Sequence, residues 1–135
     1  MPLANATGRD PHVGVEAATH ALVSLIGRWT EGKNYLPTPI APLTLHRWET
    51  PTAPTSYRPT PSVCLIAQGA KRVMLGGEVY PYDSTHLLVT TVGMPVTAQI
   101  VEASIGRPYL GLTLELKRRA IAQLMVDSNL PSPPL

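Results

Sequence analysis

The first candidates for chemistry lie in and around the stretch GGEVYPYDSTHLLV, residues 76–89. A metal site of the kind found in small β-barrels needs three or four nitrogen, oxygen or sulfur ligands that converge on one point. Two ligands on one face of a strand must be two residues apart, as in His-x-His. The four histidines, His12, His20, His46 and His86, contain no such pair. Neither a metal ion nor another cofactor is therefore expected.

Nucleophilic catalysis has no clear signature in this sequence. Cys64 is the single cysteine and lies in the apolar run SVCLIAQ, where a buried and unreactive thiol is expected. Neither a Gly-x-Ser-x-Gly elbow nor a Gly-rich phosphate loop is present. No catalytic residue is assigned.

The remaining candidates for function are polar and aromatic side chains on predicted strands. Such groups at the mouth of a small barrel bind small molecules. Which of them point inward depends on register, because a shift of one residue reverses every side chain. His86 is expected at the start of a strand at this mouth, as a ligand contact and not as a metal ligand. The full set of ligand-binding candidates is His46, Trp48, Cys64, Arg72, Tyr82, His86 and Gln99, with Tyr80 and Tyr109 of the same polar type nearby.

The elements that must position these residues are mostly strands. Gly76–Gly77 predicts a primed hairpin turn, and Pro81 indicates an edge strand or a bulge. The Pro-rich segments 36–42 and 50–61 are expected to stay outside any hydrogen-bonded ladder. Seven short strands at spacings near ten residues predict an antiparallel sandwich or small barrel: 43–49, 62–68, 71–75, 78–82, 86–92, 95–103 and 109–116.

The last predicted strand shows period two most clearly. Its four leucines, at positions 110, 112, 114 and 116, alternate with Tyr109, Gly111, Thr113 and Glu115. One face is therefore expected to be buried and the other mixed.

Helices are predicted on both sides of the strands. The first begins with Asp10 as N-cap and Pro11 in its first turn. Its apolar stripe lies either on the domain's own core or on a second chain, and consists of Val15, Ala18, Leu22, Leu25 and Trp29.

The second helix is predicted over KRRAIAQLMVDSN, residues 117–129, and is stopped by Asn129 and Pro131. Its basic first turn, Lys117–Arg119, is either a solvated corner or a contact with an acidic partner. One face of this helix carries Ile121, Leu124 and Met125.

Composition excludes several classes of protein. With 135 residues, 44% of them hydrophobic and 15% charged, the chain is expected to form one globular domain with a real core. A net charge of +2 is too small to imply a nucleic-acid partner. No signal peptide or membrane-spanning run is evident, so the expected location is the cytoplasm and no membrane partner is expected.

Four short motifs carry a resemblance to a known family: Gln68–Lys71 (Q-G-x-K), Leu75–Tyr82 (L-G-x-x-x-Y-x-Y), Pro95–Val96 and Arg107–Leu112. Over about residues 35–126 the chain resembles the N-terminal domain of AraC-type transcription regulators. The resemblance implies a mainly β, cupin-like barrel of about seven strands with flanking helices. It also implies a small-molecule effector, no enzymatic activity, and a homodimer formed through the helix after the barrel, whose candidate face is Ile121, Leu124 and Met125.

The predicted elements, taken with this resemblance, divide the chain into a helical segment (1–34), the barrel (35–116) and a C-terminal helix with a Pro-rich tail (117–135). In such regulators a second domain with two helix-turn-helix units binds DNA. Because the chain ends at Leu135, that domain is expected to be absent, and this fragment is not expected to bind nucleic acid. Two alternatives stay open: a small metal-dependent cupin enzyme, and an interaction module whose barrel is filled by its own side chains.

Overall fold

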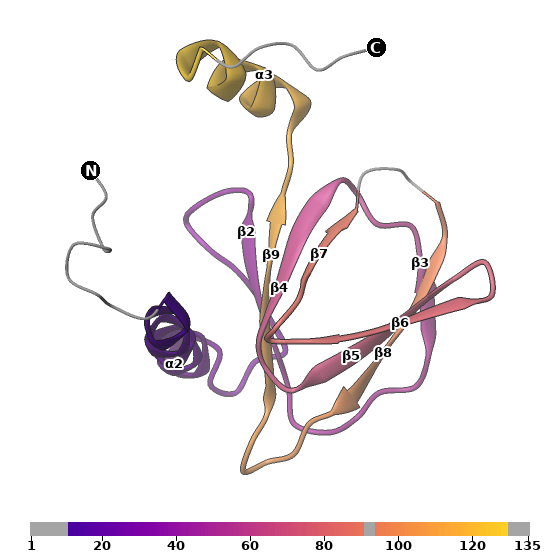
Figure 1. Cartoon of the computed structure of the whole chain (residues 1–135). Coiled ribbons are helices and arrows are strands. Elements are labelled where there is room, and N and C mark those ends of the chain that lie inside the picture. The colour runs from indigo at the N-terminus through magenta and orange to yellow at the C-terminus, as the bar shows by residue number, and fades with distance from the viewer. Residues whose placement is uncertain (1–10, 91–93, 130–135) are drawn as a thin grey trace.

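The protein is built from two antiparallel β-sheets that face each other, with one helix on the outside of the larger sheet (Figure 1). The computed structural model describes residues 11–90 and 94–129. The larger sheet has the order β1-β2-β9-β4-β7 and comprises β1 (Tyr35–Pro37), β2 (Leu43–Trp48), β4 (Ser62–Gln68), β7 (Leu87–Thr90) and β9 (Tyr109–Glu115). The smaller sheet has the order β3-β8-β5-β6 and comprises β3 (Thr55–Tyr57), β5 (Ala70–Leu75), β6 (Glu78–Asp83) and β8 (Val96–Glu102).

All seven predicted strands are present in the described part of the chain, as β2 and β4 to β9. The predicted hairpin is confirmed, because Leu75 pairs with Glu78 and both Gly76 (φ 56°) and Gly77 (φ 88°) are in the left-handed region. Pro81 lies in β6, which is an edge strand of the smaller sheet. The mainly β class predicted from the sequence is therefore confirmed.

The expectation that both Pro-rich segments stay outside any ladder is wrong. β1 pairs with β2 through Leu36 and Leu45, and β3 pairs with β8 through Ser56 and Thr97. Both added strands lie at the edges of their sheets. An edge strand tolerates proline because one of its sides needs no amide donor, so Pro37 can end β1.

The chain passes from the larger sheet to the smaller one at Gly69, between β4 and β5. Gly69 has a φ of 90°, a backbone conformation that favours glycine. A Cβ atom at this position would lie 2.6 Å from the carbonyl oxygen of Glu102 and 3.0 Å from the Cα of Tyr109. The crossover therefore depends on a residue without a side chain.

Helix α2 (Pro11–Trp29) packs on the outer face of the larger sheet, which confirms that it lies on the domain's own core. Ile26 of this helix is fully buried and joins a cluster with Leu45, Ala67 and Leu110. The helix end is fixed by Arg47 of β2, whose guanidinium donates a hydrogen bond of 3.0 Å to the carbonyl oxygen of Gly27.

The predicted stripe of α2 coincides with the buried face only at Leu22. Val15 and Trp29 are each 62% exposed and Leu25 is 46% exposed. Of the predicted stripe only Leu22 packs beside Ile26, together with Val23, which is not a stripe residue. The helix is thus rotated from the expected orientation, because apolar residues occur on more than one of its faces. Ala18 is exposed as well, and the predicted N-cap Asp10 lies outside the described residues.

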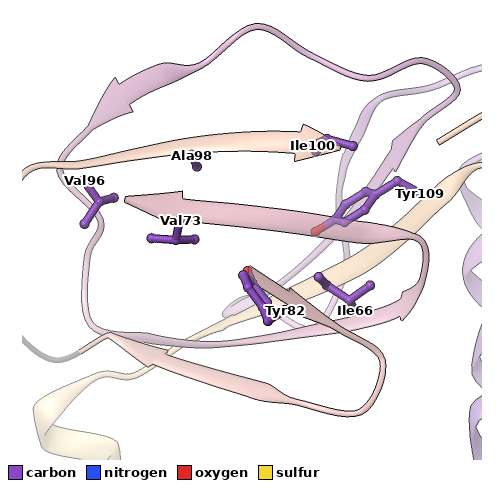
Figure 2. Close-up of a cluster of buried hydrophobic side chains, with 7 residues drawn as sticks. All are labelled: Ile66, Val73, Tyr82, Val96, Ala98, Ile100 and Tyr109. Carbon is purple, nitrogen blue, oxygen red and sulfur yellow. The ribbon is translucent and has the colours of Figure 1, made fainter. Parts of the chain in front are cut away.

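Between the sheets lies a second cluster of buried side chains (Figure 2). The larger sheet contributes Ile66, near the end of β4, and Tyr109, at the start of β9. The other half of these two strands borders a cavity. The members of this core cluster are Ile66, Val73, Tyr82, Val96, Ala98, Ile100 and Tyr109.

Helix α3 (Arg118–Asp127) follows β9 and lies beyond the end of the barrel (Figure 1). None of its residues is buried, and Leu124 is 64% exposed. The predicted stop is confirmed at Asn129, which has a φ of 51°, while Pro131 lies outside the described residues. Neither helix of the described segments is long and apolar enough to cross a membrane.

Candidate functional site

A cavity of about 470 Å³ lies between the two sheets, beside the core cluster. Its wall includes the beginnings of β2 and β4 and the end of β9, so it lies at the end of the barrel from which the chain leaves for α3. Strands of both sheets contribute side chains with polar groups: Thr44, His46, Ser62, Cys64, Lys71, Thr90, Thr113 and Glu115, together with Tyr35, Trp48, Tyr57 and Tyr109.

Five polar side chains form a continuous row across the inner face of the larger sheet. Nε2 of His46 (β2) lies 3.0 Å from the hydroxyl of Thr113 (β9), which lies 3.8 Å from the thiol of Cys64 (β4). The hydroxyl of Ser62 is 3.8 Å from the same thiol and forms a 3.0 Å hydrogen bond with the hydroxyl of Thr90 (β7). We call these five residues the polar row.

The pairing of the strands explains why the polar row is continuous. Thr113 is directly opposite Cys64, and Ser62 is directly opposite Thr90. Side chains of paired residues in antiparallel strands lie on the same face within contact distance. One sheet face therefore offers a series of hydroxyl, thiol and imidazole groups to whatever enters the cavity.

The facing sheet adds one ammonium group, that of Lys71 on β5. Burial lowers the pKa of Lys71 from its ordinary value, and the nearby Cys64 thiol acts in the opposite direction. Burial and then the Lys71 ammonium lower the pKa of His46 to about 4, so this imidazole is neutral at physiological pH. A neutral His46 can either donate to Thr113 or accept from it.

Aromatic and apolar groups complete the wall. The Tyr35 ring packs on His46 with ring centroids 5.8 Å apart, and Trp48, Leu88 and Ile100 border the inner part. Burial raises the pKa of Tyr109, which therefore remains a neutral hydrogen-bonding group. The cavity wall thus combines many polar side chains with fewer apolar ones, and both kinds of group occur in small-molecule sites.

The structure brings three of the seven ligand-binding candidates together at the cavity: His46, Trp48 and Cys64. Tyr82 is buried in the adjacent core cluster (Figure 2), and its hydroxyl has no hydrogen-bond partner among the described residues. Burial raises the pKa of Tyr82.

Arg72, His86 and Gln99 lie outside the cavity wall. Arg72 follows the inward-facing Lys71, and Gln99 lies between the buried Ala98 and Ile100, so both point to the outer face of their sheet. This alternation could not be assigned from the sequence without knowing the register.

His86 is part of an exposed turn between β6 and β7. Its Nδ1 lies 2.9 Å from the Thr85 hydroxyl and 3.5 Å from Asp83, whose carboxylate also accepts hydrogen bonds from Thr85. The Thr85 hydrogen bonds, followed by smaller effects of His86, lower the pKa of Asp83. Within residues 11–90 and 94–129, no group of three His, Cys, Asp or Glu side chains is placed to hold a metal ion.

Sequence reasoning missed most of the polar wall, above all Lys71 and Thr113. Both had a signal in the period-two pattern. Lys71 is two residues from the apolar Val73, and Thr113 is two residues from Gly111 and four from Tyr109. A charged or hydroxyl residue in phase with a buried strand face is the pattern that indicates a polar cavity wall.

Comparison with known proteins gives a family for this chain. The family model described as the AraC-type transcriptional regulator N-terminus matches residues 39–134, more than half of the sequence. The protein therefore belongs to this family, as the motifs in the strand region predicted. No match to a curated protein was found.

The solved structures found to be similar to this chain have low sequence identity to it. A cupin-2 domain protein from Shewanella frigidimarina is 9% identical with a TM-score of 0.39, and covers 55% of this chain and 69% of its own. KdgF from Halomonas sp. is 13% identical with a TM-score of 0.40, and the match covers 64% of this chain and 82% of KdgF. A salicylate 1,2-dioxygenase from Pseudoaminobacter salicylatoxidans with gentisate adducts is 17% identical with a TM-score of 0.41. The match covers 84% of this chain and 34% of the dioxygenase. Because each TM-score is below 0.5, nothing about fold, ligand or reaction follows from these values.

Proposed function

We propose that this domain senses a small molecule in its barrel cavity as part of a bacterial AraC-type transcription regulator. The observation that carries the proposal is the cavity of about 470 Å³ with its polar row, since ligand sites commonly have volumes of about 300–1,000 Å³ and a few polar groups in an apolar wall. His46, Trp48 and Cys64 are the sequence candidates proposed to contact the effector, with Tyr82 behind them.

A route from the cavity to the C-terminal helix supports a sensing role. Thr113 and Glu115 of β9 belong to the cavity wall, and α3 begins at Arg118. The backbone amide of Glu115 donates to the carbonyl oxygen of Pro42, and that of Leu116 donates to the carbonyl oxygen of Pro61. A ligand that shifts the end of β9 therefore shifts the base of α3.

The proposed mechanism is a population shift between two arrangements of α3 and the domain attached to it. A ligand changes this equilibrium only if it binds the two arrangements with unequal affinity, and coupling of about 1–3 kcal/mol is typical. DNA would be bound by a separate domain, the location would be the cytoplasm, and the barrel itself would carry out no catalysis.

The proposal includes a symmetric homodimer. In the described part of the chain, α3 has no buried residue, although Ile121, Leu124 and Met125 share one face. Ile121 is 39% exposed and Leu124 is 64% exposed. An apolar helix face without a partner in its own domain is typical of an interface, and a two-fold axis would place the same face of two protomers together.

A thermal-shift experiment with the small-molecule fraction of a host-cell extract tests the sensing function. The extract should raise the melting temperature of the parent domain, because a ligand that binds only the folded state stabilises it. Thr113→Trp, which fills the cavity, should abolish this shift. Thr97→Trp, on the outer face of β8, is the matched control and should preserve it. Equal shifts in the parent and in a folded Thr113→Trp variant would contradict binding in the cavity.

A further inference from the structure

The charged groups of the cavity wall are unequal in number. Lys71 and Arg58 are cationic and Glu115 is anionic, while the low pKa of His46 leaves it neutral. In the part of the chain that the structure describes, ion pairs join Arg47 to Glu49 and Glu102 to Arg107, and neither includes Lys71. The wall therefore carries one positive charge more than it carries negative charge.

Lys71 is the cation that lies deepest in this arrangement. It is half-buried on the inner face of β5, whereas Arg58 and Glu115 are exposed. No hydrogen bond of the Lys71 ammonium is present among the described residues, and this burial disfavours its charged form. A buried ammonium without a counter-ion costs free energy, which an anionic ligand would offset.

The groups around Lys71 define what kind of anion fits. On the opposite sheet the hydroxyls of Thr113, Ser62 and Thr90 supply neutral hydrogen-bond donors. Beyond them the wall is apolar, with Leu88 and Ile100. A site with one cation and an apolar wall fits an organic monoanion, whose charge is at one end and whose body is apolar. It fits a phosphate less well, because proteins usually hold phosphate with several Arg or backbone donors.

We infer that the cavity recognises a small organic carboxylate, with the Lys71 ammonium pairing with the ligand carboxylate and the hydroxyls of the polar row completing its hydrogen bonds. This inference rests on the proposed sensing function and specifies its ligand class. It assigns a binding role to Lys71, which was not among the ligand-binding candidates from the sequence.

Matched pairs of acids and amides test the ligand class. The probes are benzoate and hexanoate, their neutral counterparts benzamide and hexanamide, and inorganic phosphate. Binding is followed by isothermal calorimetry and by the fluorescence of Trp48, which borders the cavity. The parent should bind a carboxylate with a Kd about tenfold or more below that of its amide, because a charge-assisted hydrogen bond replaces a neutral one.

Two variants and a control isolate the charge of Lys71. Lys71→Met should remove the preference for carboxylate over amide, whereas Lys71→Arg, which keeps the positive charge, should retain part of this preference. Lys33→Met makes the same chemical change at an exposed position outside the cavity and should leave the preference unchanged. Circular dichroism of each variant establishes that it is folded.

Three results would overturn the inference: equal affinity for acid and amide, an unchanged preference in folded Lys71→Met, or tighter binding of phosphate than of any carboxylate. Absence of binding by every probe would overturn it as well. None of these results contradicts the proposed sensing function. That function is tested separately by the thermal-shift experiment with the extract, whose Thr113→Trp comparison does not depend on the charge of the ligand. Failure of the extract experiment, in contrast, would remove the sensing function itself.

Discussion

Replacing Leu124 by glutamate should abolish the proposed dimer and leave the protomer folded. Leu124 is 64% exposed in the protomer, so the substitution should change the free energy of unfolding of the single domain by only about 0.5 kcal/mol. In the dimer the same position would bury a carboxylate without a partner, at a cost of about 3 kcal/mol or more. Two-fold symmetry doubles this cost to roughly 6 kcal/mol, which corresponds to a rise in Kd of about ten-thousandfold.

Sedimentation velocity at tens of micromolar, with parent and Leu124→Glu measured side by side, is the appropriate assay. The parent should sediment as a dimer and the variant as a monomer with an unchanged circular dichroism spectrum. Val126→Glu adds the same charge to another face of α3, at a residue that is 74% exposed, and should remain dimeric. A monomeric parent, or a dimeric Leu124→Glu variant, would refute the assignment of this face to the interface.

Three further predictions concern the barrel. Gly69→Ala should lower the melting temperature and cost about 2 kcal/mol or more, because its Cβ would lie 2.6 Å from the Glu102 carbonyl oxygen at a positive φ; an unchanged melting temperature would show that the crossover can relax. Lys71→Met should stabilise the ligand-free domain by about 1–2 kcal/mol in urea unfolding, since it removes a desolvated charge, and a loss of stability would mean that the charge is compensated. His46 has a folded-state pKa of about 4 against 6.5 for the unfolded chain, so the unfolded state takes up the proton first and stability should fall as pH falls from about 6.5 to about 4. His46→Gln should reduce that fall by roughly 3 kcal/mol, and identical pH profiles would contradict a buried neutral imidazole.

Strands separated by turns were the part of the fold that the sequence could predict. Period two and the Gly76–Gly77 turn locate β5 and β6 without knowledge of the tertiary structure, because both are local properties. The two short strands β1 and β3 escaped prediction because only their pairing at a sheet edge defines them. Their sequences alone are typical of extended loops.

The direction in which each strand face points was not predictable from the sequence. In β9 the leucines were expected on a buried face, and Leu110 is indeed buried, but under α2 on the outside of the barrel. Tyr109 and Thr113, on the mixed face, border the interior. A sheet covered by a helix on one side and by a second sheet on the other has two buried faces, so hydrophobicity alone cannot identify the inner one.

Lys71 is the most informative residue that sequence reasoning passed over. Its position in the Q-G-x-K motif marked the family, yet a lysine on a strand is ordinarily assigned to solvent. Only the pairing of β5 with β8 and the phase shared with Val73 turn it inward. For the same reason Arg72, its neighbour, points outward and does not border the cavity.

Native mass spectrometry of the domain purified from its own host tests the central claim, that the barrel holds a small molecule, most directly. We expect a species heavier than the protein by the mass of one small organic acid, which is released on denaturation and detected in negative-ion mode. The species should be absent from Thr113→Trp, in which the cavity is filled, and present in Thr97→Trp. A parent domain that carries no adduct and acquires none from the host small-molecule extract would contradict the claim.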